Sequence, residues 1–86
     1  LRLGLVNQVV MPDALDDAVA ALVRRVCAGP RQTFAEMKRL LNESPDQSLV
    51  TQLQLEAEAF ARCAAHSDFD EGVNAFLGKR RPHFKG

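Results

Sequence analysis

Apolar residues that recur every three or four positions constrain the fold of this chain more than any other feature of its sequence. The pattern occupies four segments, and residues that stop or start helices separate these segments. A helix has 3.6 residues per turn, so this spacing places apolar side chains on one face, whereas a strand needs a spacing of two. The sequence therefore predicts an all-α fold of four helices, each with one apolar stripe.

Helix start and stop residues set the expected bounds. Pro12 suits a first turn, Gly29 with Pro30 stops a helix, and Ser67 with Asp70 three residues on resembles a capping box. The expected helices cover residues 12 to about 28, 33 or a neighbour to 42, 48 to about 65, and 67 to a point before 82. The first helix is expected to bury a stripe of Leu15, Val19, Leu22 and Val26. The apolar faces expected on the other three are Phe34, Met37, Leu40 and Leu41; Leu49, Leu53, Ala57, Phe60 and Ala64; and Phe69, Val73, Phe76 and Leu77.

The chain opens inside an apolar run, residues 1–10, with no methionine before it. Gly4 and the pair Asn7-Gln8 interrupt this run, which favours a strand or an extended segment over a helix. We expect residues 1–11 to form an extended segment that joins a preceding core, and residues 12–86 to form a C-terminal helical domain. The chain is thus interpreted as a piece of a longer protein.

The charge balance argues against some classes of binding partner, and the cysteine content indicates the redox compartment of the protein. The 11 Lys and Arg residues balance the 11 Asp and Glu residues, so no overall field attracts nucleic acid or an anionic membrane. Cys27 and Cys63 lie in apolar contexts with no second thiol nearby, which indicates free thiols, buried in the core, in a reducing compartment. No stretch approaches the roughly 20 apolar residues that span a bilayer. We expect a soluble, cytoplasmic protein.

Few side chains in this sequence suggest catalysis or metal binding. Neither cysteine has an acid–base partner at a recognisable spacing. Glu56 and Glu58 are two residues apart, which separates them by about 200° around a helix, so both are expected on the solvated surface. The acids after His66 could suggest a metal site, but acids favour the first turn of a helix for electrostatic reasons. We therefore expect no catalytic residue and no metal ligand in this chain.

The most distinctive cluster lies near the C-terminal end. Phe76 and Lys79 are three residues apart, which would place them on one helical ridge. The basic residues that follow are Arg80, Arg81, His83 and Lys85. An aromatic ring beside a cation suits a nucleotide, because the ring packs on a base while the cation meets a phosphate. Phe76 also continues an apolar core stripe, and cations are favoured at a helix C-terminus, so spacing alone leaves both interpretations open.

Several short motifs occur in a fixed order along the whole chain. They are Gly4-Leu5-Val6 with Val9-Val10 and Leu15, then Lys38-Arg39-Leu40-Leu41-Asn42, then Glu56 and Phe60, and finally Asp68-Phe69, Glu71-Gly72-Val73, Ala75-Phe76-Leu77, Lys79-Arg80-Arg81, Pro82 and Phe84. In this order and spacing they make the chain resemble the C-terminal region of the enoyl-CoA hydratase/isomerase (crotonase) superfamily. Gly78 departs from the pattern, because many relatives have an acidic or longer residue there.

The resemblance implies a parent enzyme that hydrates 2-enoyl-CoA thioesters or isomerises their double bond, in fatty-acid or aromatic-acid breakdown. It implies that a core absent from this chain supplies the catalytic acids and two backbone amides that stabilise an enolate. The helical region would cover the active site, build a trimer or hexamer and contact CoA, with Phe76 near the adenine, Lys79 at a phosphate and Arg80 in support. Acyl-CoA is then the substrate, no cofactor is bound tightly, and the isolated 86 residues are inactive.

Two other classes of function are compatible with the residues alone. A free-standing helical module could bind a partner protein through its apolar faces, with no ligand and no catalytic activity. A small nucleic-acid binder could use residues 79–85, although the balanced net charge and the single short basic cluster argue against it.

Overall fold

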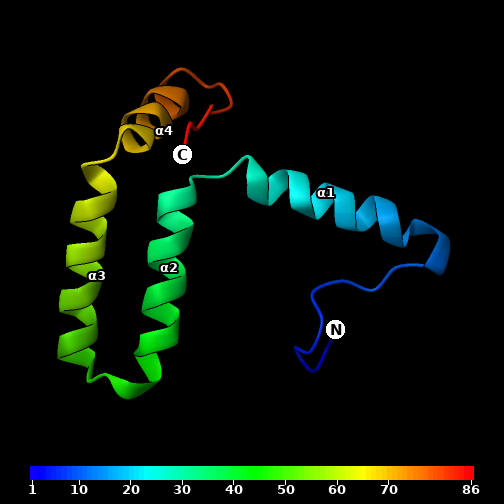
Figure 1. Ribbon diagram of the computed structural model, residues 1–86, viewed down its shortest axis with the longest axis horizontal. Coiled ribbons are helices and arrows are strands. Elements are labelled where there is room, and N and C mark those ends of the chain that lie inside the picture. Colours follow the sequence, from blue (N-terminus) through cyan, green and yellow to red (C-terminus); the bar gives the residue numbers. More distant parts are fainter.

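Four α-helices and two short 3-10 turns make up the regular structure in the computed structural model, which describes residues 1–86. The elements are η1 (Pro12–Ala14), α1 (Leu15–Cys27), α2 (Arg31–Glu43), η2 (Ser44–Asp46), α3 (Leu49–Ala64) and α4 (Ser67–Leu77). No residue lies in a strand, and residues 1–11 form turns and irregular chain beside α1 (Figure 1). The predicted all-α fold with four helices after an extended segment is confirmed.

The residues at the helix ends explain most of these bounds. Ser48 is the N-cap of α3, and its Oγ accepts a hydrogen bond from the Thr51 amide at 3.2 Å. The capping box predicted at Ser67 is wrong, because His66 is the N-cap of α4 and its Nδ1 accepts from the Asp68 amide at 3.1 Å. The imidazole nitrogen satisfies one of the free amides of the first turn, and Ser67 lies inside the helix.

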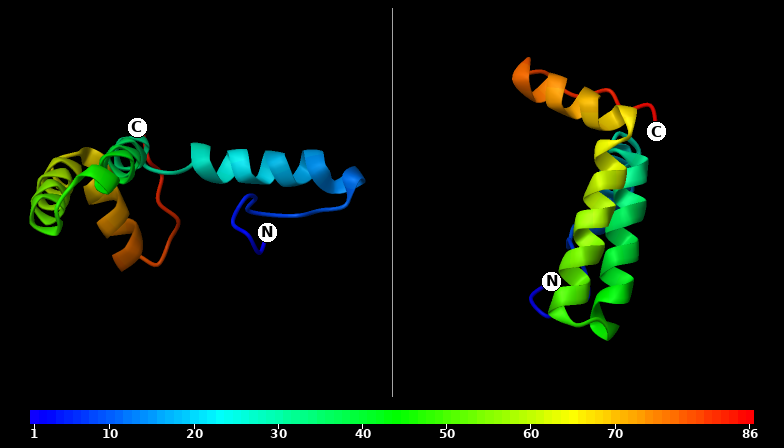
Figure 2. Two further views of the ribbon diagram at one scale, coloured as in Figure 1. Left: turned by 90° about the horizontal axis from the view of Figure 1, so that it is seen from below. Right: turned by 90° about the vertical axis from the view of Figure 1, so that its left-hand side faces the viewer.

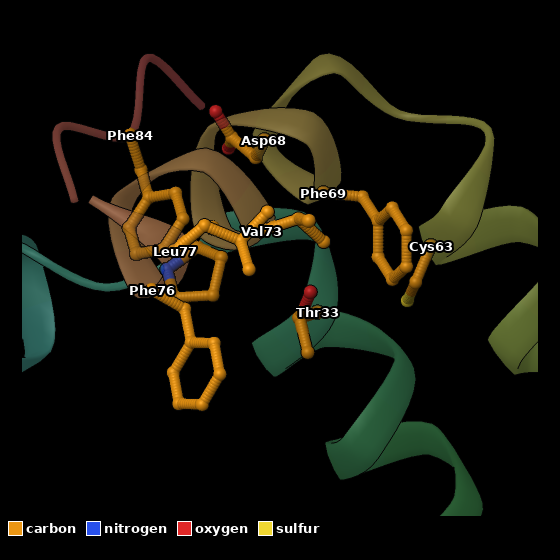
Figure 3. Close-up of a pocket in the computed structure, with 10 residues that line it drawn as sticks. Thr33, Cys63, Asp68, Phe69, Val73, Phe76, Leu77 and Phe84 are labelled. Carbon is orange, nitrogen blue, oxygen red and sulfur yellow. The ribbon is translucent and has the colours of Figure 1, made fainter. Parts of the chain in front are cut away.

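An antiparallel hairpin of α2 and α3 is the best-packed part of the chain, and the other elements extend from its open end (Figures 1 and 2). Helix α1 points away from the hairpin, while α4 crosses the end of α3. The ring of Phe69 in α4 lies near Cys63 of α3 (Figure 3). It also meets the ring of Phe60 edge to face, with 6.1 Å between centroids and 86° between planes, a preferred aromatic geometry. These contacts join α4 to α3.

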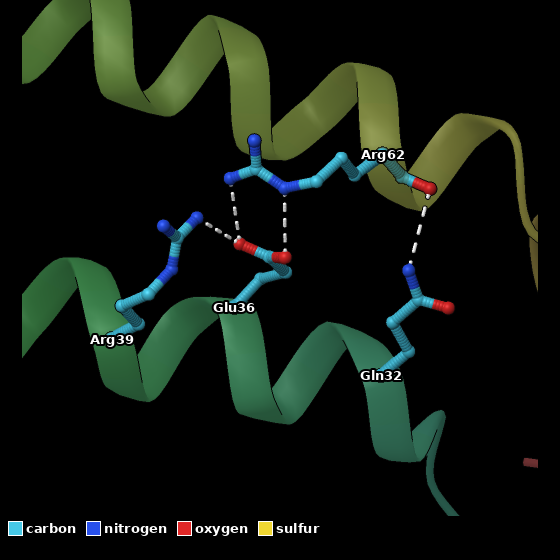
Figure 4. A network of polar contacts seen from close by, with 4 residues as sticks. All are labelled: Gln32, Glu36, Arg39 and Arg62. Carbon is cyan, nitrogen blue, oxygen red and sulfur yellow. Dashed lines mark hydrogen bonds and ion pairs between the residues drawn. The ribbon is translucent and has the colours of Figure 1, made fainter.

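A charged network links the two helices of the hairpin (Figure 4). Arg62 of α3 donates from Nε and Nη2 to the two carboxylate oxygens of Glu36 in α2, at 2.9 and 3.0 Å. Arg39, one turn further along α2, donates to the same carboxylate. A two-bond guanidinium–carboxylate pair has a fixed planar geometry, so it sets the register of α2 against α3.

This network predicts a specific loss of helix in acid. The guanidinium groups of Arg62 and Arg39 lower the pKa of Glu36 from 4.5 to about 2. Because the folded-state pKa lies below the unfolded value, the stabilisation is complete above pH 4.5 and disappears as the pH falls through about 2. We expect Glu36→Gln to lose less helix than the unsubstituted chain across this interval, measured by far-ultraviolet circular dichroism. Equal losses in both proteins would contradict the assignment.

The apolar stripes are correctly placed on helices but are not buried within this chain. Ala59, Ala75 and Asp68 are the three buried residues, and the α1 stripe exposes 50% to 55% of each side chain. The radius of gyration is 16.5 Å, whereas a compact domain of this length has about 12 Å. The prediction that the α1 stripe is buried is therefore wrong within this chain, because the four helices form a single open layer with no second layer to cover them.

Candidate functional site

An apolar groove of about 360 Å³ lies where the start of α2, the end of α3 and one face of α4 meet. Its lining residues are Pro30, Thr33, Cys63, Asp68, Phe69, Gly72, Val73, Phe76, Leu77 and Phe84. Phe84 comes from the C-terminal tail, which we define as residues 79–86, and its ring lies over α4 close to the Leu77 and Val73 side chains (Figure 3). Aromatic and aliphatic walls of this kind suit a ligand with a flat apolar part.

A chain reversal at the end of α4 brings the tail back to the groove. The Arg80 amide donates to the Ala75 carbonyl at 3.0 Å, and the Lys79 amide donates to the Phe76 carbonyl at 3.2 Å. This pair of bonds is the Schellman arrangement, in which the residue at the position of Lys79 adopts a left-handed conformation and is usually glycine. Lys79 has φ of 51° there. The reversal therefore places a lysine in a left-handed backbone conformation, which is unfavourable for residues other than glycine.

Glu71 of α4 fixes the first part of the tail. Its two carboxylate oxygens accept hydrogen bonds from the Arg80 guanidinium, and one of them also accepts from the His83 amide at 3.0 Å. The Arg80 guanidinium, followed by the His83 amide, lowers the pKa of Glu71 from 4.5 to about 2, and the same contact raises the pKa of Arg80. Glu71 and Arg80 therefore remain charged and paired at neutral pH.

Asp68, one turn earlier on α4, fixes the end of the tail. It exposes only 6% of its surface and accepts hydrogen bonds from the Lys85 amide at 2.9 Å and the Gly86 amide at 3.2 Å. The Phe84 ring lies over Gly72, where a Cβ atom would be 3.7 Å from the ring, an ordinary van der Waals contact. The tail thus forms a fixed wall of the groove.

The three residues predicted to contact CoA occupy different environments. Phe76 exposes 82% of its surface beside the groove, so it is not a core residue of this chain. Lys79 is exposed and forms no ion pair, whereas the Arg80 guanidinium is held by Glu71. The expectation that Phe76 and Lys79 share a helical ridge is wrong, because α4 ends at Leu77 and Lys79 is left-handed. Their roles in ligand binding stay predictions.

The remaining candidate residues, two cysteines and two glutamates, do not come together in a site. Cys27 and Cys63 are free thiols, but the prediction that they are buried is wrong, because Cys27 is exposed and Cys63 is half-buried in this open arrangement of helices. Glu56 and Glu58 are exposed, as predicted for a solvated surface. No group of three His, Cys, Asp or Glu side chains is arranged to hold a metal ion. None of the four helices combines the length and apolar character that a bilayer-spanning segment requires.

Sequence reasoning missed the tail anchors and the aromatic wall. Asp68 was explained by its place in the first turn of a helix, which gave no reason to expect it to bind the chain end. Glu71 and Arg80 are nine residues apart, beyond the range of helical pairing, so only a chain reversal can join them. The nearest signal was Gly78, which ends α4 as its C-cap, but the left-handed residue of the reversal is Lys79.

Comparisons of sequence and of structure with known proteins find relatives of the same kind. The chain matches the family model described as enoyl-CoA hydratase/isomerase over residues 1–86. It is 35% identical over 83 residues to crotonyl-CoA hydratase of Syntrophomonas wolfei and, equally, to 1,2-epoxyphenylacetyl-CoA isomerase of Escherichia coli, covering 96% of this chain and 32% of each relative. Its fold is similar to the crystal structure of an enoyl-CoA hydratase from Polaromonas sp. JS666, with a TM-score of 0.88, 39% identity and coverage of 98% and 33%. The chain spans about a third of the length of these relatives.

Proposed function

The chain belongs to the enoyl-CoA hydratase/isomerase family, and we propose that it is the C-terminal helical region of an enzyme acting on 2-enoyl-CoA thioesters. In this proposal residues 1–11 join a catalytic core, and residues 12–86 form the helical domain that covers it. The core supplies the amides and acids that stabilise and protonate an enolate, so no catalytic residue is assigned here. The enzyme is a cytoplasmic homo-oligomer, a trimer or hexamer, with acyl-CoA as its substrate.

The open surface of the chain supports a covering role. Its accessible surface is 7470 Å², whereas a compact monomer of this mass has about 5,000 Å². The difference is of the size that obligate interfaces bury, which exceeds about 2,000 Å². Apolar stripes such as Leu15 to Val26 on α1 account for part of this area, and a core or a neighbouring subunit would cover them.

The exposed ring of Phe76 and the unpaired side chain of Lys79, three residues further on, are the observations that support a CoA contact. A ring exposed this fully gains no packing within this chain, and a partner that covers it would remove its apolar surface from water, which is favourable. A nucleotide base is such a partner, and the ammonium group of Lys79 can meet a phosphate of the same molecule. Arg80 is assigned a supporting role only, because Glu71 already occupies its guanidinium.

The proposed activity is tested with the full-length protein and crotonyl-CoA. Addition of water removes the conjugated double bond and its ultraviolet absorbance, whereas isomerisation moves the bond and keeps the mass of the substrate. Hydration is the preferred reaction, because one relative is named crotonyl-CoA hydratase. Isomerisation is the second candidate, because a relative of equal identity is named an isomerase, although its named substrate is 1,2-epoxyphenylacetyl-CoA. A full-length protein that neither converts enoyl-CoA nor binds CoA would refute the proposal.

Replacement of Phe76 by alanine is expected to raise the KM for acyl-CoA about fivefold with kcat unchanged, since stacking on one ring is worth roughly 1 kcal/mol. Phe76→Leu keeps apolar bulk without the flat ring, so its KM should lie between those of the unsubstituted enzyme and Phe76→Ala. Leu49→Ala is the matched control, because this exposed apolar residue lies at the far end of α3 from the groove (Figure 1). Equal KM values for all four proteins, measured by steady-state kinetics, would exclude Phe76 from the contact.

A further inference from the structure

Two carboxylates one turn apart on α4 hold the whole C-terminal tail. Glu71 binds the Arg80 guanidinium and the His83 amide, and Asp68 binds the amides of Lys85 and Gly86. Residues three apart on a helix share one side, so both carboxylates face the returning chain. The tail forms no helix or strand of its own, and these contacts replace regular backbone pairing.

Lys79 lies at the hinge of this return. Its φ of 51° belongs to a region that favours glycine, and such geometry persists only where surrounding contacts impose it. The contacts next in sequence are those of Arg80 and His83 with Glu71. The conformation that presents Lys79 beyond the end of α4 is therefore held by the backbone bonds of the reversal together with Glu71, a residue that lines no part of the apolar groove itself.

We infer that Glu71 is a positioning residue for acyl-CoA binding: by holding Arg80 and His83 it keeps the tail closed, fixes the placement of Lys79 and retains Phe84 as a wall of the groove. The inference rests on the proposed function, because it assigns a purpose to the placement of Lys79. It also gives Arg80 a structural role, that of the tail's main anchor to α4, in place of a direct contact with phosphate.

Glu71→Gln in the full-length enzyme tests this inference. We expect the KM for acyl-CoA to rise about threefold with kcat unchanged, because an exposed ion pair makes only a weak contribution to the position of the tail. Amide hydrogen exchange at His83, Lys85 and Gly86 should accelerate in the same variant. Arg80→Ala should produce the same rise in KM, and the double variant should be no worse than either single one, since both substitutions break one contact.

Glu36→Gln is the matched control, because it removes a carboxylate that is bound by an arginine in the same two-bond geometry but joins α2 to α3. It should leave the KM and the exchange of the tail amides unchanged. Glu71→Asp retains the charge on a shorter side chain, so it should recover part of the affinity for acyl-CoA that Glu71→Gln loses. These two comparisons separate positioning of the tail from a general loss of stability.

Three results would overturn the inference. Unchanged exchange of the tail amides in Glu71→Gln would show that the carboxylate does not hold the tail. Faster exchange with an unchanged KM, in an enzyme where Lys79→Ala raises the KM, would show that the tail position is irrelevant to binding while the proposed function stands. A lower KM in Glu71→Gln would mean that release of Arg80 improves binding, which identifies Arg80 as a direct phosphate contact.

Discussion

Replacement of Lys79 by alanine is expected to raise the KM for acyl-CoA about tenfold in the full-length enzyme and to leave kcat unchanged. A hydrogen bond to a charged group contributes roughly 1.5 kcal/mol or more, and about 1.4 kcal/mol corresponds to a factor of ten. The contact is far from the reacting thioester in the proposed arrangement, so it strengthens substrate and transition-state binding equally and affects KM alone. Steady-state kinetics measures both constants.

Replacement of Lys79 by glycine separates binding from folding at the same position. It should raise the KM as much as alanine does, since the ammonium group is lost in both variants. Glycine also relieves the left-handed geometry at φ of 51°, so the melting temperature should rise, with a gain of about 1 kcal/mol in stability. Alanine retains the backbone cost. Opposite effects on stability and affinity are therefore expected from one substitution.

Arg81→Ala is the matched control for Lys79, because it removes a neighbouring tail cation that forms no side-chain ion pair. Its KM should stay within about twofold of the unsubstituted enzyme, as expected for an exposed charge without a partner. Equal increases in KM for Lys79→Ala and Arg81→Ala would point to a general field of positive charge. An unchanged KM for Lys79→Ala would remove Lys79 from the proposed contact.

The isolated 86-residue chain is expected to self-associate, which is the second large effect. Its radius of gyration and accessible surface both exceed those of a compact monomer, and its exposed stripes include most of the large apolar side chains of α1 and α3. Contiguous apolar surface of this extent drives association in water. Sedimentation velocity and small-angle scattering should therefore report particles heavier than 9.5 kDa that grow with concentration.

A double variant, Val19→Glu with Val26→Glu, provides the control for association. The two residues are seven positions apart on the exposed stripe of α1, so the substitutions interrupt one apolar face without touching the hairpin or the groove. The variant should associate less at the same concentration. A stable, monomeric wild-type chain with a radius of gyration of about 12 Å would contradict the prediction, because it would mean that the chain covers its own apolar surface.

Local sequence was sufficient to predict the helices and nearly all of their bounds. Pro12 opens the first helical stretch, Gly29 and Pro30 close it, and Ser48 caps α3 where the sequence indicated. Such signals act within one turn, through backbone amides and carbonyls that the cap residue reaches directly. The N-cap of α4 was predicted one residue too late, because His66 and not Ser67 caps the helix. This cap also acts within one turn.

Burial could not be predicted in this way. A spacing of three and four residues identifies an apolar face but does not identify what covers it. Phe76 and Leu22 follow the same rule in sequence as core residues do, yet both are largely exposed because the helices form one layer. The same spacing also placed Lys79 on a ridge with Phe76, although the helix ends two residues before Lys79.

The candidate site could therefore be predicted only in part from the sequence. Composition, periodicity and ordered motifs determined the all-α class, the helix positions and the family resemblance, because each depends on neighbouring residues. The pairing of Arg80 with Glu71, the anchoring of the chain end on Asp68 and the seat of Phe84 over Gly72 depend on the tertiary fold. These contacts join residues that are 9 to 18 positions apart, and only the left-handed reversal at Lys79 brings them within bonding distance.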